Sequence, residues 1–461
     1  MPQGAEAVRV TFVVSRINLS NGGGSNHSFH LTASQLRRLG HDVRVLVLTP
    51  SGVQAESELP YRVAAVDAAY RTRLGQIQLT EDLLHEHGHD TDVFHLYAPQ
   101  LAFGGGRYRA RGGRVPVAVT LNSYQLFCTD LNRMDGACHA RCGVLQRLAH
   151  SPNRPLAKVR SAPMRLYERW LGFEHAAWVD CFLPDSPAVA RIYQEAGFDM
   201  ARSALIPEVI DVQRIRASAG EPAAQPREGV WRVLFAGRLV PAKGADLVID
   251  ALADVERPVH LHVAGDGPER AALEARARGR GLTGRVTFHG WVPNHELWPL
   301  YRRMHLFVHP GRWPEPCGRT VQEAMALGVP TLVSDTGGPP WLVGEHGTTF
   351  APSDPADLAE KLRRCLDRYE DTVRRARQAE ARAEEFDYRP VVHRLECVYE
   401  GLVRDALGSR ASRASRPEPA PRPSGAGPGA LGSATAEPGG PVSWLAAFAP
   451  APTTWTGRRR R

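Results

Sequence analysis

Residues 231–252 read WRVLFAGRLVPAKGADLVIDAL, which is an apolar strand followed by a short basic loop and a helix. The same order recurs as far as residue 335, with strands expected at VHLHVAG, RVTFHG, LFVHP and PTLVSD and with helices expected over 244–253, 268–279, 294–303 and 318–327. Apolar strands that alternate with helices are typical of a parallel sheet covered on both faces. The second half of the chain therefore predicts a doubly wound α/β domain.

The first half of the chain repeats this pattern. A strand over 8–14 (VRVTFVV) leads through the glycine-rich loop NLSNGGGSN into a helix that ends near Gly40, a residue type that commonly terminates helices. Further strands are expected at DVRVLVLT, VFHLY and VPVAVTL. Doubly wound domains bind ligands at the carboxyl ends of their strands. Two Rossmann-like domains in succession therefore predict an α/β fold with a binding cleft between the domains.

Composition divides the chain into segments. The polar stretch SAGEPAAQPREG has no periodicity and indicates a linker over 218–229, between an N-terminal domain (1–217) and a second domain (230–387). A final helix over 388–405 is expected to return towards the N-terminal domain. Residues 406–461 are rich in Pro, Gly and Ala, and we expect this tail to be disordered.

The composition and net charge exclude several classes of protein. The 461 residues are 43% hydrophobic and 23% charged, which excludes a largely disordered chain or a membrane bundle. The net charge of +8 arises mainly in the tail, where eight arginines and two glutamates follow residue 406. The remaining body is close to neutral, which argues against nucleic acid as a partner. Because the N-terminus lacks a basic leader and no stretch approaches about 18 apolar residues, we expect a cytoplasmic protein.

Two cations follow the first strand of the second domain. Arg238 and Lys243 lie in the loop and at the first helix position after WRVLFAG, and Lys243 is one of only three lysines in the chain. The amides and dipole of a helix N-terminus attract anions, and nearby cations add to that attraction. We therefore interpret Arg238 and Lys243 as a clamp for a diphosphate; the alternative is a solvated basic loop.

Two glutamates lie eight residues apart in the stretch HPGRWPEPCGRTVQEAMALGVP. Glu315 follows the strand LFVHP in a loop, where its carboxylate can reach sugar hydroxyls. Glu323 lies inside the helix that Gly318 opens and can accept hydrogen bonds from both hydroxyls of a ribose. The backbone amides from Gly318 through Arg319 to Thr320 are expected to face phosphate. Either glutamate alone could be structural, and it is their place beside the basic loop that indicates a binding site.

Several motifs together give the chain a resemblance to a known family. GRLVPAKGADLVIDAL, VAGDGPE, FHGWV and EPCGRTVQEAMALGVPTLVSDTGG resemble the nucleotide-sugar domain of the retaining GT-B glycosyltransferases of family 4, whose signature is a Glu-x7-Glu pattern. The resemblance extends over about residues 8–405. It implies the GT-B fold, with an acceptor-side N-terminal domain and a second domain that binds a nucleoside diphosphate sugar.

The resemblance also implies roles for individual residues. Arg238 and Lys243 would bind the donor diphosphate and Glu315 would contact the transferred sugar, and these three are the implied catalytic residues. The remaining donor-binding positions are the ribose carboxylate, the helix amides, the glycine-rich loop and an asparagine of the N-terminal domain: Glu323, Gly318, Arg319, Thr320, Gly22, Gly23, Gly24 and Asn122. We expect no metal site, because the cations neutralise the leaving diphosphate, and no cofactor, because the nucleotide sugar is a substrate.

Two positions depart from the family pattern. In TLNSYQLFCTDLNRMDGACHARC, Asn122 stands where the family has histidine, so it can hydrogen-bond a sugar hydroxyl but cannot carry a positive charge. In the second domain, Trp341 stands where glutamate is common after the GG-x-P turn. Both departures bear on which sugar is bound and not on the fold.

Two groups of residues contain side chains of metal-binding types. The motif D-T-D at 90–92 precedes the strand VFHLY, which places it at the amino end of the sheet and away from ligands. Three cysteines with a histidine among them have a spacing that fits no common zinc finger, so free thiols or a loop staple compete with a zinc site: Cys128, Cys138, His139 and Cys142.

The preferred function is therefore a retaining, metal-independent transferase that moves a hexose from a nucleoside diphosphate sugar to a hydroxyl acceptor. The alternatives are a GT-B nucleotide-sugar epimerase or hydrolase and a catalytically silent GT-B scaffold. The acceptor is either a soluble small molecule or a lipid-linked sugar. Residues 154–173 (RPLAKVRSAPMRLYERWLGF) combine cations with aromatic residues, so they form either a core helix or a helix at a membrane surface, which would make the protein peripheral.

Overall fold

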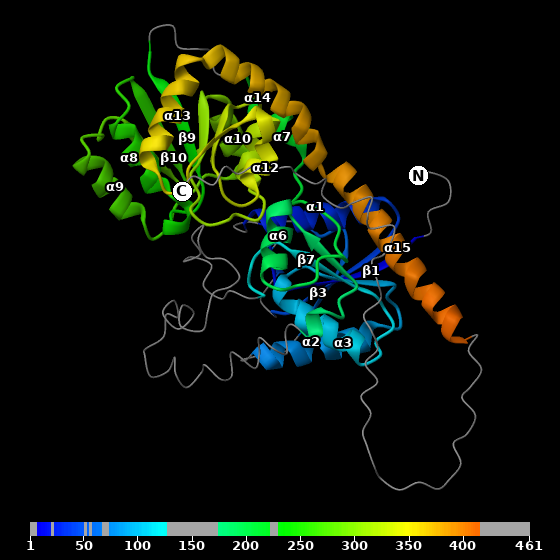
Figure 1. Cartoon of the computed structure of the whole chain (residues 1–461). Helices are drawn as coiled ribbons and strands as arrows, with labels where there is room; N and C mark the ends of the chain where they lie inside the picture. Colours follow the sequence, from blue (N-terminus) through cyan, green and yellow to red (C-terminus); the bar gives the residue numbers. More distant parts are fainter. Residues whose placement is uncertain are drawn as a thin grey trace, which may run out of the picture.

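The computed structural model describes residues 7–19, 23–49, 53–54, 58–66, 73–126, 174–221 and 229–414. Within these residues the chain forms two lobes, each built around a six-stranded sheet whose strands all pair in parallel (Figure 1). A helical arm, α14 followed by α15, runs along one side of both lobes. The fold is thus the expected pair of doubly wound α/β domains.

The N-terminal sheet has the strand order β5-β3-β1-β6-β7-β8, so the chain changes its direction of winding at β1. The register of β1 with β3 runs from Arg9 opposite Asp42 to Val14 opposite Val47. In sheet order the six strands are Arg62–Ala65, Asp42–Val47, Arg9–Val14, Val93–Leu96, Val117–Leu121 and Cys181–Pro184. A small two-stranded sheet pairs β2 (Ile17–Asn18) with β4 (Val53–Gln54).

Helices cover both faces of this sheet, because side chains along a strand alternate between its faces. Phe12 of β1 faces the core formed with α1 and α15, and its neighbour Val13 faces the core on the opposite side. That opposite core includes residues of α2, α3 and α6. The helices are α1 Gly24–Arg38, α2 Arg73–His87, α3 Ala102–Ala110 with the short η1 Pro99–Leu101 before it, and α6 Pro187–Glu195.

The C-terminal sheet repeats the topology, with the order β11-β10-β9-β12-β13-β14 and the change in winding at β9. In sheet order its strands are Val286–Gly290, Val259–Ala264, Trp231–Ala236, Leu306–His309, Thr331–Ser334 and Thr348–Phe350. The helices on one face are α8 Ala245–Ala253, α9 Arg270–Gly279 and α13 Pro355–Asp367. Those on the other are α7 Val212–Ala219, α10 Asn294–Arg302, α11 Arg319–Ala326, α12 Pro339–Val343 and α14 Tyr369–Ala383.

The chain crosses between the lobes twice, and the two crossings lie side by side. The Ile210 amide donates to the Phe386 carbonyl at 3.1 Å, and the Tyr388 amide donates to the Ile210 carbonyl at 2.9 Å. The Asp387 carboxylate accepts a hydrogen bond from the Val212 amide at 3.0 Å. After this point α15 (Tyr388–Ala414) packs against the N-terminal sheet through a row of buried apolar side chains.

Two expected boundaries are wrong. Helix α7 belongs to the C-terminal core, although residues 1–217 were expected to form the N-terminal domain; Ile215 and Ala219 are buried among the C-terminal side chains. The chain therefore passes from the N-terminal lobe to the C-terminal lobe near Ile210, before the polar stretch, because the apolar side of α7 packs on α10 and α11. The final helix also continues to Ala414, nine residues past the expected end at 405. Residues 415–461 of the expected tail lie outside the described residues.

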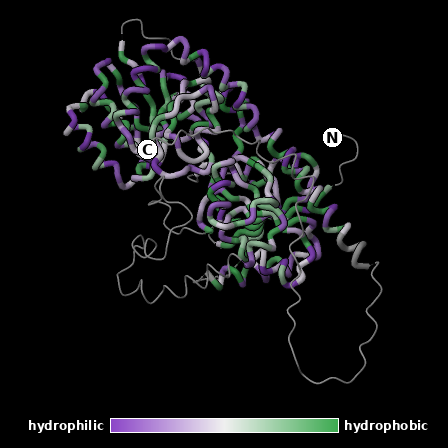
Figure 2. The backbone as a smooth tube through the Cα atoms, in the orientation of Figure 1, coloured by the Kyte–Doolittle hydropathy of each residue, from purple (hydrophilic) through white to green (hydrophobic). Residues whose placement is uncertain are grey.

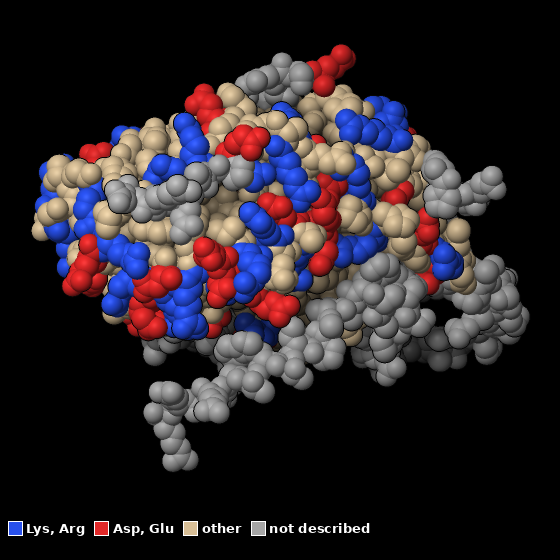
Figure 3. All heavy atoms as spheres, turned by 90° about the horizontal axis from the view of Figure 1, so that it is seen from above, with Lys and Arg blue, Asp and Glu red and all other residues tan. Residues whose placement is uncertain are grey.

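Apolar residues concentrate on the strands and on the inner sides of the helices, and polar residues lie on the outside of both lobes (Figure 2). On the face drawn in Figure 3, acidic and basic side chains are interspersed. No described helix has the length and apolar character that crossing a membrane requires.

Candidate active site at the domain interface

The start of α1, which follows β1, meets the start of α11, which follows β12, between the lobes. In the N-terminal lobe the glycine-rich loop after β1 ends at Gly23, which precedes the first turn of α1. In the C-terminal lobe Gly318 precedes the first turn of α11. The first amides of a helix have no partner within the helix and attract anions. Two such helix N-termini therefore border the carboxyl edges of the two sheets, where doubly wound folds bind ligands.

Lys243 and Glu315 form an ion pair at the carboxyl edge of the C-terminal sheet. The Lys243 ammonium donates to Glu315 Oε2, and both side chains are less than a fifth exposed. The Trp313 indole N–H donates to the same oxygen at 2.7 Å, and its ring lies 5.7 Å from the Lys243 nitrogen. Trp313 thus orients both charged groups, although no motif had indicated a role for it.

The backbone explains why these two residues meet. Lys243 ends the short η3 turn (Pro241–Lys243) after β9, two residues before α8 begins, so it is not at the first helix position as expected. Gly244 has φ +68°, and a Cβ there would lie 2.1 Å from the Pro310 carbonyl oxygen of the loop after β12. Because β9 and β12 are neighbours, the glycine allows their two loops to touch.

A second glycine turn holds the Glu315 backbone. The Gly338 amide donates to the Glu315 carbonyl at 2.7 Å, and Gly337 has φ +71°. A Cβ at Gly337 would lie 2.4 Å from the Glu315 carbonyl oxygen, so a side chain there would displace the loop. The GG turn after β13 therefore fixes the position from which the Glu315 carboxylate extends.

The charge of Lys243 keeps Glu315 ionised. Burial alone would raise the pKa of Glu315, but the Lys243 ammonium, His309 and the two hydrogen bonds hold this pKa below its ordinary value. His309, the last residue of β12, is buried, and burial lowers its pKa to about 4. His309 Nδ1 has no hydrogen-bond partner among the described residues. At neutral pH the Glu315 carboxylate is therefore ionised and the His309 imidazole is neutral.

A second ion pair lies at the start of α11. The Arg319 guanidinium donates to Glu323 Oε1 at 3.1 Å, and the Glu323 side chain is only 2% exposed. The same guanidinium donates to the Gly24 carbonyl across the interface at 3.3 Å. A Cβ at Gly24 would lie 2.9 Å from Arg319 Cδ. The structure therefore brings the expected Gly24, Arg319 and Glu323 together from opposite lobes.

The remaining expected residues lie at the same edge with different surroundings. Asn122 follows β7, and its amide donates to the Ser25 hydroxyl at 2.8 Å, so it contacts the first turn of α1. Gly318 precedes α11 and has φ +112°, and Arg319 and Thr320 are the first two residues of that helix. Arg238 follows β9 but is exposed, with no side-chain partner among the described residues. Gly22 lies outside the described residues.

Two carboxyl groups of the N-terminal lobe also lie near this site, and sequence patterns had not indicated them. Asp185 directly follows β8 and is 2% exposed. Glu208 precedes α7, and its backbone carbonyl accepts a hydrogen bond from the Gln322 side chain of α11 at 2.7 Å. No local motif surrounds either residue, and only the fold brings these carboxyls to the interface.

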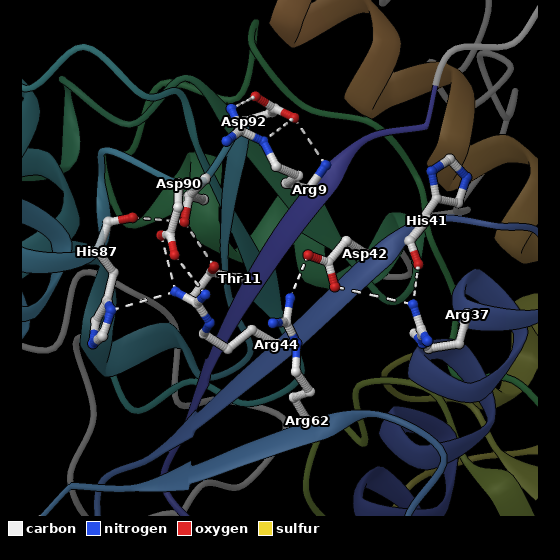
Figure 4. A network of polar contacts seen from close by, with 11 residues as sticks. Arg9, Thr11, Arg37, His41, Asp42, Arg44, Arg62, His87, Asp90 and Asp92 are labelled. Atoms are coloured by element: carbon white, nitrogen blue, oxygen red, sulfur yellow. Dashed lines mark hydrogen bonds and ion pairs between the residues drawn. The ribbon is translucent and has the colours of Figure 1, made fainter.

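The D-T-D motif lies at the opposite edge of the N-terminal sheet (Figure 4). Asp92 Oδ1 accepts from Arg9 at 2.6 Å and Asp90 Oδ1 accepts from Arg44 at 2.9 Å, and the Asp42 carboxylate pairs with Arg62 in the same network. Through these ion pairs with arginines, the aspartates connect neighbouring strands at the amino ends of the sheet. Among the described residues no group of three or more His, Cys, Asp or Glu side chains has an arrangement suited to a metal ion.

Trp341, which stands where the family has glutamate, is part of the C-terminal core. The Trp341 ring packs on Phe386, with ring centroids 5.3 Å apart, so it contributes to the core beside α14. The residues outside the described part of the chain include the whole stretch 154–173 and the thiol group: Cys128, Cys138, His139 and Cys142.

Known proteins resemble both lobes. The model of the family "Glycosyltransferase Family 4" matches residues 22–214, and that of "Glycosyl transferases group 1" matches residues 221–382. A GDP-mannose-dependent alpha-mannosyltransferase of Mycobacterium tuberculosis (strain CDC 1551 / Oshkosh) is 30% identical over 358 residues, which are 74% of this chain and 82% of the relative. A glycogen synthase of the same strain is 27% identical over 416 residues, covering 82% and 91% of the two chains.

Solved structures share the fold. Sucrose-phosphate synthase from Thermosynechococcus elongatus superposes with a TM-score of 0.63 at 19% identity, covering 88% of this chain and all of that one. The Anabaena protein HepE, solved in complex with UDP, superposes with a TM-score of 0.62 at 19% identity, covering 87% of this chain and all of that one. The two-lobed architecture is therefore that of the GT-B fold.

Proposed function

Since the chain belongs to the family 4 glycosyltransferases, we propose that its interlobe site transfers a hexose from a nucleoside diphosphate sugar to a hydroxyl acceptor, with retention of the anomeric configuration and without a metal ion. One observation carries the proposal: two ion pairs of the C-terminal lobe, Lys243–Glu315 and Arg319–Glu323, lie at the carboxyl edge of its sheet, beside the N-terminus of α11. The names of the mannosyltransferase and glycogen synthase relatives agree with hexosyl transfer.

Each charged group suits one part of such a donor. Lys243 and the first amides of α11 supply positive charge for the diphosphate, and we assign the exposed Arg238 of the loop after β9 to the same group. Glu323 accepts hydrogen bonds from the ribose. Glu315 uses Oε2 for Lys243 and Trp313, and its Oε1 has no hydrogen bond within the described residues, so Oε1 is the oxygen we assign to a sugar hydroxyl.

The reaction needs charge stabilisation at the leaving group. As the bond between the sugar and the diphosphate breaks, negative charge grows on the phosphate oxygen, and we assign Lys243 and the helix amides to stabilise that charge. The acceptor hydroxyl attacks from the face that the diphosphate leaves, and its proton passes to the departing phosphate oxygen. In this route the positive charge comes from side chains and amides, which is why we propose that no metal ion is required.

A donor screen tests this proposal. The full chain is incubated with UDP-, GDP- and ADP-sugars, release of the nucleoside diphosphate is measured with and without EDTA, and the anomeric configuration of the product is read by NMR. We expect release from one class of donor, unaffected by EDTA, and an α-linked product from an α-linked donor. Failure to bind any nucleoside diphosphate sugar would favour a silent scaffold, and a donor epimerised without transfer would favour the epimerase.

A further inference from the structure

Asp185 and Glu208 emerge together at the carboxyl edge of the N-terminal sheet. The segment before Glu208 runs alongside β8: the Ala204 amide donates to the Phe182 carbonyl at 2.9 Å, and the Ile206 amide donates to the Pro184 carbonyl at 3.1 Å. Asp185 is the first residue after β8, so this pairing brings the two acidic residues side by side at its end. Gln322 of α11 contacts the Glu208 backbone from the other lobe.

Asp185 has an oxygen that no described residue satisfies. Its side chain is buried, and Oδ2 has no hydrogen-bond partner among the described residues. A buried polar group without a partner destabilises the folded state, and an unpaired buried charge destabilises it more. The carboxyl is therefore suited either to carry a proton or to meet a polar group that arrives with a ligand.

Within the described part of the chain, both cations that act on Glu208 are already paired. The charges that act on Glu208 from the other lobe are those of Arg319, Glu315 and Lys243, and each of the two cations is already paired with a glutamate. The remaining titratable groups that face Asp185 or Glu208 are Tyr97 after β6, Tyr124 after β7 and Cys317 before α11, and the pKa of each is raised, first by burial. With both carboxyls ionised, the site would carry a net negative charge before any diphosphate arrived.

Burial favours the protonated forms of both carboxyls. It raises the pKa of Asp185 well above the ordinary value, and the negative charge of Glu208 raises it further. The pKa of Glu208 rises to about 7, through burial first, with Arg319 opposing and Glu315 adding to the shift. Two neighbouring carboxyls of this kind titrate as a pair, so the proton is shared between them and not assigned to one residue.

We propose that Asp185 and Glu208 are a further part of the donor site and take up a proton when a nucleoside diphosphate sugar binds. This inference rests on the proposed function, because it needs a diphosphate beside Lys243 and Arg319. The diphosphate brings two negative charges and engages the cations that now oppose the charge on Glu208. Its arrival therefore stabilises the protonated form of the pair, and a protonated carboxyl also becomes a hydrogen-bond donor towards the phosphate or sugar oxygens.

The expected pH dependence follows from linkage. If the bound state holds more protons than the free state, the dissociation constant of the donor rises with pH by up to about tenfold per unit. Affinity is then full at low pH, where the pair is already protonated in the free enzyme, and is lost as the pH rises through the pKa of the bound enzyme. UDP-glucose and GDP-mannose are suitable probes, because their diphosphates have no group that titrates between pH 6.5 and 8.5.

The test is calorimetric titration of the full-length chain with both probes at pH 7.5, in buffers of different ionisation enthalpy, followed by dissociation constants from pH 6.5 to 8.5. For the probe that binds, we expect uptake of about 0.5–1 proton per molecule. Asp185→Asn and Glu208→Gln keep the side-chain shapes and should abolish most of the uptake and flatten the pH dependence. Glu86→Gln, at an exposed carboxylate on α2, is the matched control and should leave the uptake unchanged.

The outcomes separate the two proposals. If neither probe nor other nucleoside diphosphate sugars bind, the proposed function fails. If a probe binds without proton uptake, the inference about the pair fails while the function stands. If uptake persists in both variants, the proton goes to His27 or His309, whose pKa values burial lowers to about 4 and whose neighbours include Arg319 and Lys243, and the pair is excluded. Circular dichroism of each variant shows whether the fold is intact.

Discussion

Arg319 of the C-terminal lobe packs directly on Gly24 of the N-terminal lobe. Its guanidinium donates to the Gly24 carbonyl at 3.3 Å and also to the Glu323 carboxylate, so one side chain joins the glycine-rich loop to the expected ribose-binding residue. The first turns of α1 and α11 approach this closely because residue 24 has no side chain. A glycine expected to face phosphate thus has a second role in allowing contact between the lobes.

Gly24→Ala should weaken donor binding through this contact. The added methyl group overlaps Arg319 Cδ, and overpacking of this kind costs about 1–3 kcal/mol, so we expect donor KM to rise about 5- to 150-fold. Gly23→Ala is the contrast, because a Cβ there meets no atom within 4 Å, and its effect should be much smaller. In an Arg319→Ala background Gly24→Ala should cost little; an additive double variant would contradict the packing argument.

Lys243→Ala and Arg238→Ala should each raise donor KM and lower kcat together, because each removes positive charge opposite the leaving diphosphate. Charged hydrogen bonds contribute about 1.5–3 kcal/mol, which corresponds to about 10- to 100-fold in kcat/KM. Lys243→Ala should have the larger effect, since Lys243 also orients Glu315 and the exposed Arg238 does not. Steady-state kinetics against the donor measure this, and wild-type values for both variants would exclude the diphosphate assignment.

Acid should destabilise the fold in part through a buried histidine. His95 lies between Tyr399 and Thr120, at 2.5 and 2.7 Å, and burial lowers its pKa to about 3 from 6.5. Because the unfolded chain binds the proton more readily, the free energy of unfolding falls as the pH drops below 6.5, by on the order of 3 kcal/mol at pH 4. Urea unfolding at pH 7 and pH 4 should show a smaller loss for His95→Gln.

His295→Gln is the control for that experiment, because the His295 side chain is 74% exposed. It should retain the acid sensitivity of the wild type. An equal loss of stability in His95→Gln and wild type between the two pH values would mean that other groups account for the acid response.

The residues that follow α15 should be dispensable for folding, whereas the buried part of α15 should be required. Leu395, Val398, Tyr399 and Leu402 are buried against the N-terminal sheet. A chain that ends at residue 414 should therefore keep wild-type thermal stability and donor turnover. A chain that ends at residue 394 should lose the cooperative unfolding transition, since it exposes that core. Loss of the fold in the chain that ends at residue 414 would contradict this division.

The identity of the acceptor can be approached through residues 154–173. If this cationic and aromatic stretch contacts lipid, the chain ending at 414 should sediment with anionic vesicles at low salt, where electrostatic attraction is strongest. Reversal of Arg165 and Arg169 to glutamate should then abolish the binding with the fold intact. Such a result would support a lipid-linked acceptor, and absence of binding at low salt would support a soluble one.

Much of the C-terminal lobe follows from local sequence. The helices expected over 244–253 and 294–303 are α8 (Ala245–Ala253) and α10 (Asn294–Arg302), because apolar periodicity and glycine or proline boundaries act within a few residues. The sequence could predict that Lys243 and Glu315 lie at the same edge of the sheet, since Lys243 follows β9 and Glu315 follows the neighbouring strand β12. Their direct ion pair depends on the contact between the two loops at Gly244, which no local pattern indicates.

The missed features are those that depend on contacts between distant segments. Asp185 and Glu208 have no motif, and the backbone pairing that brings them together involves a segment without regular periodicity. Helix α7 precedes the polar stretch at 218–229, yet its apolar side fits the C-terminal core, so composition alone placed the boundary too late. Trp313 is likewise an ordinary loop residue until Glu315 and Lys243 are seen beside it.

The backbone hydrogen bonds of Ile210 with Phe386 and Tyr388 show that the C-terminal lobe is inserted between two parts of the N-terminal lobe. The chain enters this lobe and leaves it at adjacent points, and α15 then completes the core of the N-terminal lobe. Residues 210–387 thus form a unit with neighbouring ends, the arrangement that tolerates excision or exchange between proteins. We therefore expect that the C-terminal lobe can be replaced as a single cassette, while the N-terminal lobe remains intact around α15.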